Sequence, residues 1–254
     1  MSSAAGIAYS EHRGGSFHDP PLVLIHGAGG DRLHWPPQLR RLDGKCVYGL
    51  DLPGHGESPG EGERTVHAYA DRLVAWMDAM EIDQIVPCGH SMGGAISMTA
   101  ALEYPDRVAA MVLVGTGARL RVSPDILEIT TNEGQLQAAA DLVVSWAFSP
   151  SASPRLIELG RERYGSAQLD TMHHDFVACN HFDVMDRLEE IECAALIICG
   201  EDDQLTPTKY SRFLADHIPQ ASLEIMPEAG HMVMLEKPEE IAKSIGGFME
   251  KTRD

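Results

Sequence analysis

The sequence is short of positive charge, and it contains neither a paired-cysteine motif nor a long apolar run. Its 254 residues include 20 Lys and Arg against 38 Asp and Glu, which gives a formal net charge of −18. Such acidity disfavours binding to the phosphates of nucleic acids and to anionic membrane surfaces. No stretch approaches the roughly 18 consecutive apolar residues of a membrane helix, and residues 1–15 lack the apolar core of a signal peptide. We therefore expect a cytoplasmic protein with no nucleic-acid or membrane partner.

Cysteine usage also limits the class of protein. The five cysteines are an odd number without C-x-x-C spacing, and three of them lie in or beside apolar, strand-like runs. This pattern predicts buried free thiols rather than disulfides or a metal site. With 44% hydrophobic and 23% charged residues, the composition is that of an ordinary globular protein.

Strand-like and helix-like segments alternate along the first 115 residues, which is typical of a parallel sheet with helices on both faces. Helical patterns replace the strand signal from 119 to 187, and strands resume at 194. We therefore predict an α/β core of residues 1–118 and 188–254, interrupted by a helical cap at 119–187. Pro87 lies inside an expected strand, where it removes a ladder hydrogen bond, so we expect a bulge or a shorter strand there. Before the cap, the expected strands are 7–11, 22–25, 46–50, 85–88 and 111–114, and the expected helices are 35–42, 66–80 and one directly after Ser91.

The most informative motif is Gly89-His90-Ser91-Met92-Gly93, which joins an apolar strand to a predicted helix. A serine on such a sharp turn has a strained backbone, and the two glycines leave room where a Cβ would clash. The turn exposes the hydroxyl and directs helix N–H groups at a negative charge forming beside it. Ser91 could be a helix cap, but the flanking glycines favour a nucleophile.

A serine nucleophile needs a base and an acid that orients the base. An apolar run at 194–199 leads into Asp202 and Asp203, and a second run at 221–226 leads into Gly230-His231. Ligands bind at the carboxyl ends of parallel strands, so the sequence predicts Ser91, His231 and one of these aspartates as a triad. The His26-Gly27-Ala28-Gly29-Gly30 loop follows another strand. Backbone N–H groups of Ala28 and Met92 are the candidates for an oxyanion hole.

Together these segments resemble the α/β-hydrolase fold family, in particular its cofactor-free serine hydrolases. The matching segments are H-G-x-G at 26–29, the turn at 51–58, the G-x-S-x-G motif, G-x-x-D-x-x-x-P at 200–207, and Gly230-His231. The resemblance implies a small-molecule substrate, no cofactor, no metal, a monomer or homodimer, and a cap inserted after the sixth strand. In the family's spacing the acid is the fourth residue of its loop, which selects Asp203. The family has a further edge strand at the start, which we expect to be shortened or missing here.

The expected reaction is hydrolysis of a carboxylic ester or lactone of a small, largely apolar substrate through an acyl-enzyme intermediate. Methionines and aromatic residues are frequent in the predicted cap, so we expect an apolar pocket. The candidate pocket residues are the cap aromatics Trp146, Phe148, Phe176 and Phe182.

Single residues distinguish the expected reaction from other reactions that enzymes of this fold catalyse. Dehalogenases and epoxide hydrolases use an aspartate nucleophile, and hydroxynitrile lyases carry a lysine where this chain has Met232. Carbon–carbon hydrolases of meta-cleavage products share Ser-Met-Gly-Gly but usually have Asn at the position of His90. Their substrate carboxylate needs a cation, for which the candidates are Arg119, Arg121, Arg155, Arg161 and Arg163. Carbon–carbon hydrolysis, perhydrolysis on the same triad, and ligand binding with little turnover stay open as alternatives.

Overall fold

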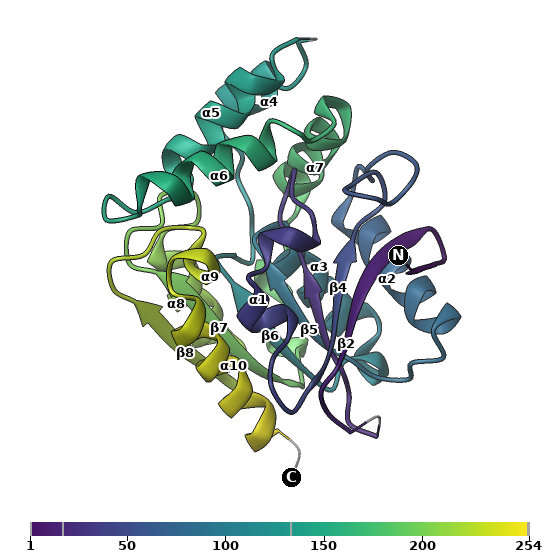
Figure 1. Cartoon of the computed structure of the whole chain (residues 1–254). Coiled ribbons are helices and arrows are strands. Elements are labelled where there is room, and N and C mark those ends of the chain that lie inside the picture. The colour runs from purple at the N-terminus through teal and green to yellow at the C-terminus, as the bar shows by residue number, and fades with distance from the viewer. Residues whose placement is uncertain (1, 17, 133, 253–254) are drawn as a thin grey trace.

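The computed structural model describes residues 2–16, 18–132 and 134–252. Within this part of the chain, eight strands form one sheet in the order β1-β2-β4-β3-β5-β6-β7-β8 (Figure 1). The strands β3 to β8 run parallel to one another, whereas β1 and β2 are antiparallel to their neighbours. The predicted fold class is confirmed. The strands are β1 Ser2–Ala4, β2 Ile7–Arg13, β3 Leu22–Ile25, β4 Cys46–Asp51, β5 Val86–His90, β6 Ala110–Val114, β7 Ala194–Gly200 and β8 Ala221–Met226.

Helices cover both faces of the sheet. Helix α1 (Pro37–Arg40) packs against α10 (Pro238–Lys251) on one face, and α2 (Val66–Ala79) packs against α3 (Met92–Glu103) on the other (Figure 1). Helix α8 (Thr208–His217) contacts β7 and β8, and α9 (Val233–Glu236) precedes α10. Short 3₁₀ turns occur at η1 (Arg32–His34), η2 (Pro105–Arg107) and η3 (Met185–Glu190).

The prediction of a helix over 35–42 is wrong in its length, since α1 covers only Pro37–Arg40. Only one turn forms. The helix cannot begin before Pro37, because the residue before a proline avoids helical geometry, and it ends where the backbone of Arg41 leaves that geometry. The expected edge strand at the start of the chain is present but shortened to the three residues of β1.

A second group of helices lies between β6 and β7 in the sequence. It consists of α4 (Pro124–Ile129), α5 (Leu136–Ala147), α6 (Pro154–Tyr164) and α7 (Leu169–His181), which lie together at the upper end of the molecule in Figure 1. Helices α4 and α6 each begin with proline at a position that needs no N–H, after the capping serines Ser123 and Ser153. Helix α7 also contacts α3, the helix that follows Ser91. The domain limits at 118/119 and 187/188 stay a prediction.

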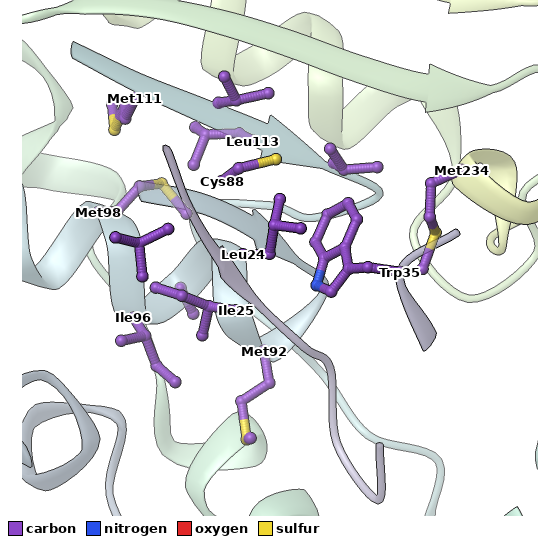
Figure 2. Close-up of a cluster of buried hydrophobic side chains, with 14 of the residues drawn as sticks. Leu24, Ile25, Trp35, Cys88, Met92, Ile96, Met98, Met111, Leu113 and Met234 are labelled. Carbon is purple, nitrogen blue, oxygen red and sulfur yellow. The ribbon is translucent and has the colours of Figure 1, made fainter. Parts of the chain in front are cut away.

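Apolar side chains from adjacent strands and from the helices that cover them form one buried core. Figure 2 shows Leu24, Cys88 and Leu113 from β3, β5 and β6, together with Trp35 and Met234, all fully buried. All five cysteines are free thiols, and the prediction of burial holds for Cys46, Cys88, Cys179 and Cys199, whereas Cys193 is half-buried. None of the described helices is long and apolar enough to cross a membrane.

Pro87 is accommodated by a bulge in the neighbouring strand. It pairs with Val23 of β3, and the ladder to β6 is interrupted beside it. Three positions separate Ile85 from Cys88, whereas four separate their partners Val108 and Val112. The additional residue between Val108 and Val112 forms a bulge opposite Pro87. Because proline has no N–H, it cannot donate to the ladder at this point, and the bulge interrupts the pairing there.

Candidate active site

Ser91 lies on a strained turn between β5 and α3. Its φ of 51° and ψ of −113° fall in a region that L-residues rarely adopt. A Cβ at Gly89 would lie 2.0 Å from the carbonyl oxygen of Gly93, and a Cβ at Gly93 would lie 2.2 Å from that of Ile25. The two glycines are therefore required by close backbone packing, as the motif predicts. The Ser91 N–H donates to the Val114 carbonyl at 2.9 Å, which anchors the turn to β6.

Asp203 and His231 meet although 28 positions separate them along the chain. The Nδ1 of His231 lies 2.9 Å from Oδ2 of Asp203, and both side chains are buried. Backbone N–H groups of Leu205 and Thr206 donate to Oδ1 at 2.9 and 2.8 Å, and the Thr206 hydroxyl donates to Oδ2 at 2.7 Å. Burial alone would raise the pKa of Asp203, but His231 and these donors together lower it below its usual value.

An ionised Asp203 accepts a hydrogen bond from the Nδ1–H group of His231, and this tautomer leaves Nε2 of the ring free to accept a proton. Asp202 makes no such contact, since its side chain is exposed and its N–H donates to the Ala229 carbonyl at 2.8 Å. The geometry therefore brings Asp203, and not Asp202, against the histidine.

Ser91 and His231 line one cavity of about 370 Å³. Ala28 lines it too, as do residues of α4, α5 and α7, among them Ile126, Trp146 and Phe176. The other lining residues are Leu120, Arg121, Val122, Ser123, Cys179, Gln204, Leu205, Thr206 and Tyr210. The surface of the cavity is more apolar than polar, and polar side chains such as Ser91, Arg121 and His231 lie among the apolar ones, which is the usual character of a small-molecule site.

Two of the four aromatic residues proposed for the pocket lie elsewhere. Trp146 and Phe176 line the cavity, but the ring of Phe148 lies against Gly160 of α6, where an added Cβ would come within 2.7 Å of it. Phe148 lies just past the end of α5 and has an extended backbone, with a φ of −114° and a ψ of 150°, so its side chain does not follow the helix face that carries Trp146. Phe182 follows the end of α7 and lines a separate cavity against α2 and α3.

The candidate oxyanion donors come from two segments near Ser91, namely Ala28, which lines the same cavity, and Met92, which directly follows Ser91. Gly27 to Gly30 form a turn that the Gly30 N–H closes on the Gly27 carbonyl at 3.0 Å, with Gly29 at a φ of 64°. Met92 begins α3, and its side chain is buried in the core in Figure 2, so only its backbone is available to the site. No other described residue accepts a hydrogen bond from the backbone N–H of Ala28 or Met92. These two groups are the available donors that an oxyanion hole requires.

Two buried histidines support the loops that carry these groups. Nδ1 of His26 donates to the Gly27 carbonyl at 2.8 Å and its Nε2 accepts from the Leu52 N–H at 3.1 Å, which fixes one neutral tautomer. Burial and the neighbouring His55 lower the pKa of His26 to about 3. Nε2 of His90 donates to the His231 carbonyl at 3.1 Å, and burial together with His231 lowers the pKa of His90 well below its usual value. Neutral histidines thus connect the functional loops without adding charge.

Sequence reasoning did not name several residues that the structure brings to this region. Thr206 contacts both Asp203 and His231, and its place in the G-x-x-D-x-x-x-P loop is the only local signal for it. Tyr210 lines the cavity from α8, and Asp175 of α7 contacts the Gly27–Gly30 turn. Nothing in the local sequence marks the last two. Among the described residues, no group of three or more His, Cys, Asp or Glu side chains could hold a metal ion.

Comparisons with known proteins agree on one family. Residues 20–238 match the family model described as alpha/beta hydrolase fold. The chain is 29% identical to a putative carbamate hydrolase RutD of Caulobacter sp. (strain K31), with 96% of each protein covered. It is 28% identical to a 2-hydroxymuconate semialdehyde hydrolase of Pseudomonas sp. (strain CF600), covering 97% of this chain and 92% of that one. A solved thermophilic esterase superposes with a TM-score of 0.83 at 33% identity, covering 97% of this chain and 94% of the esterase.

Proposed function

Because this chain belongs to the α/β-hydrolase fold family, we propose that it is a serine hydrolase that cleaves a carboxylic ester or lactone of a small, largely apolar substrate. The observation that carries the proposal is the arrangement of Ser91, His231 and Asp203. Ser91 and His231 line one cavity, and Asp203 holds the far side of the imidazole at 2.9 Å. The likeness to a thermophilic esterase at 33% identity supports ester hydrolysis among the reactions of the family.

The proposed mechanism uses only groups of this chain. The Ser91 hydroxyl attacks the carbonyl carbon while Nε2 of His231 takes its proton, and Asp203 stabilises the imidazolium that forms. The negative charge on the former carbonyl oxygen is stabilised by the N–H groups of Ala28 and Met92. Collapse of this intermediate breaks the bond to the alcohol, which receives its proton from His231. Water then attacks the acyl-enzyme with the same histidine as base, and this step releases the acid and regenerates Ser91.

The cavity favours a compact acyl group. We assign α4 to α7 the role of a cap, because Ile126, Trp146 and Phe176 from these helices line the same cavity as Ser91. Each methylene buried there contributes about 0.8 kcal/mol, roughly a fourfold gain in kcat/KM, until the volume is filled. The lactone variant requires no further group, since a lactone is an internal ester.

A series of p-nitrophenyl esters tests the proposal. We expect kcat/KM to rise over the first few acyl carbons and then to level off, with hydrolysis abolished by a fluorophosphonate that labels Ser91. Stoichiometric labelling without sustained turnover would instead identify a ligand-binding protein on this fold. Weak, length-independent ester hydrolysis would contradict the esterase assignment.

A second candidate function is supported by Arg121. Of the five arginines considered, it alone lines the cavity. The others lie beside carboxylates, Arg119 by Asp183, Arg155 by Glu158, Arg161 by Asp141 and Arg163 by Asp31. No ion pair to Arg121 occurs within the described chain. A cation at this place suits a substrate that carries a carboxylate, such as a meta-cleavage product, and the semialdehyde hydrolase relative at 28% identity keeps this candidate open.

Charge-matched substrates separate the two candidates. The assay compares p-nitrophenyl butyrate with the p-nitrophenyl half-ester of succinic acid and with one meta-cleavage product, in the wild type and in Arg121→Gln. If the natural substrate is anionic, Arg121→Gln reduces kcat/KM for the two acids and leaves the neutral ester unchanged. Equal effects on all three substrates would remove the argument for a carboxylate. The exposed Arg119→Gln, outside the cavity, is the matched control.

A further inference from the structure

Asp175 is a fully buried carboxylate that the proposed mechanism does not use. It lies on α7, one position before Phe176, which lines the cavity. The Gly29 N–H donates to its Oδ2 at 2.8 Å, and the Tyr69 hydroxyl donates to its Oδ1. Nε2 of His55 lies 2.7 Å from Oδ2. One side chain of α7 therefore joins the Gly27–Gly30 turn, the loop after β4 and helix α2.

The contacts of His55 define the charge of this cluster. Its Nδ1 lies 3.0 Å from the Pro53 carbonyl, which can only accept, and its Nε2 faces the Asp175 carboxylate. Both nitrogens therefore carry protons, and the ring is an imidazolium. Burial lowers the pKa of His55, but the charge and hydrogen bond of Asp175 outweigh it and raise the pKa above its usual value. The cluster is a buried ion pair, in which loss of one partner would leave the other uncompensated.

The link to Gly29 acts on the residue next to a candidate oxyanion donor. Ala28 lines the substrate cavity, whereas Gly29 lines a different one together with His55, so the two neighbours face opposite sides of the turn. The His26 contacts restrain the turn before Ala28, and the hydrogen bond to Asp175 restrains it directly after. Ala28 is therefore held from both sides. Catalysis is sensitive to such restraint, because a misplacement of about 1 Å can cost on the order of 10²-fold in rate.

We propose that Asp175 is a positioning residue for the oxyanion hole, which holds the Ala28 N–H in place through its contact with Gly29. The inference rests on the proposed function, since it assigns a task within that reaction. This role also connects the proposed cap to the reacting groups. Phe176 and Cys179 of α7 line the cavity, so substrate contacts on this helix act on the same element that holds the Gly27–Gly30 turn.

Asp175→Asn is the informative variant because an amide has nearly the same shape but cannot satisfy all of the partners. If the amide oxygen accepts from Gly29, a neutral His55 must break its contact with either the new side chain or the Pro53 carbonyl. If the amide nitrogen faces His55 instead, that nitrogen confronts the Gly29 N–H. We expect kcat for a p-nitrophenyl ester to fall by about 10- to 100-fold, with little change in KM, because an oxyanion donor acts mainly in the transition state.

Ligand affinities distinguish a positioning role of Asp175 from a purely structural one. Asp175→Asn should weaken binding of a boronic acid, which mimics the tetrahedral intermediate, by the same factor as kcat. Affinity for the carboxylic acid product should remain near the wild-type value. The matched control is His174→Ala on the same helix, which removes a contact from Nδ1 to the Gly62 carbonyl at 3.2 Å without touching the turn. This control should lower the melting temperature and leave kcat unchanged.

Amide hydrogen exchange provides a readout that needs no turnover. In Asp175→Asn, exchange of the Gly29 amide should become faster, and in His174→Ala it should not. If the wild type hydrolyses no ester, the proposed function fails. Separately, faster exchange at Gly29 in a folded Asp175→Asn protein that keeps wild-type kcat and boronate affinity would overturn the positioning role. If exchange stays unchanged because the amide oxygen keeps the Gly29 hydrogen bond, Asp175→Ala, which has no acceptor, repeats the test, and wild-type kcat in it overturns the proposal. If Asp175→Asn does not fold, His55→Gln and Tyr69→Phe replace it, and wild-type kcat in both refutes the proposal.

Discussion

Replacing Asp203 by asparagine tests the proposed triad most directly, because the structure defines what the amide would do. The carboxylate accepts from two backbone N–H groups on Oδ1 and from Thr206 and His231 on Oδ2. The side-chain oxygen of Asn can keep the two backbone donors. Its NH₂ group then faces Nδ1 of His231, which must accept a hydrogen bond. The proton of the imidazole moves to Nε2, the atom that has to take the proton from Ser91.

The expected size of the effect follows from this change of tautomer. Loss of the correct tautomer in a Ser-His-Asp triad costs on the order of 10⁴-fold in kcat. This corresponds to about 5.4 kcal/mol of transition-state stabilisation, at 1.36 kcal/mol for each factor of ten. The substrate cavity does not include Asp203, so KM should change little. Because the pKa of Asp203 is lowered, the wild type should keep its oriented imidazole to a pH below the usual range for aspartate.

The assay is steady-state hydrolysis of a p-nitrophenyl ester by the wild type, Asp203→Asn and Asp202→Asn at neutral pH. Asp202 is adjacent, acidic and exposed, so Asp202→Asn controls for a general change of charge in the loop. We expect a loss in Asp203→Asn and activity within about twofold of the wild type in Asp202→Asn, as for an exposed surface substitution. A larger loss at Asp202, or retention of more than a few per cent of activity by Asp203→Asn, would refute the reasoning.

Three further predictions concern the nucleophile, the turn and the buried histidines. Ser91→Ala should lower kcat by on the order of 10⁶-fold, and activity of a few per cent in a contaminant-free preparation would contradict it. Gly89→Ala should yield little folded protein, because its Cβ would lie 2.0 Å from the Gly93 carbonyl; a wild-type melting temperature would disprove this. The raised pKa of His55 contributes stability below its unfolded pKa, near 6.5, that is lost as the pH rises through the folded value. The lowered pKa of His26 acts oppositely, so stability is lost as the pH falls below 6.5 toward about 3. Melting temperatures should therefore decline on both sides of neutrality, and the alkaline decline should be smaller in His55→Gln.

Local sequence patterns were sufficient for the order of the elements and for the residues proposed to carry the reaction. The alternation of apolar strands and helices predicts a parallel sheet, and the carboxyl ends of its strands place Ser91, Asp203 and His231 at one edge. The glycines around Ser91 could be interpreted directly because their requirement is steric and acts within a few residues. The choice of Asp203 over Asp202 depended on its position in the loop and agrees with the observed contact to His231.

Tertiary packing decided the features that join distant segments. The bulge opposite Pro87 depends on a neighbouring strand, and the separation of Trp146 from Phe148 depends on which helix covers each ring. The contact from Asp175 to Gly29 spans 146 positions, and the contact from Asp175 to Tyr69 spans 106. Periodicity and capping are set by residues within a turn or two, so they cannot encode such pairings. A buried aspartate in α7 becomes a partner of the Gly27–Gly30 turn only when the helix packs against that turn, and packing also brings His55 and Tyr69 to compensate its charge.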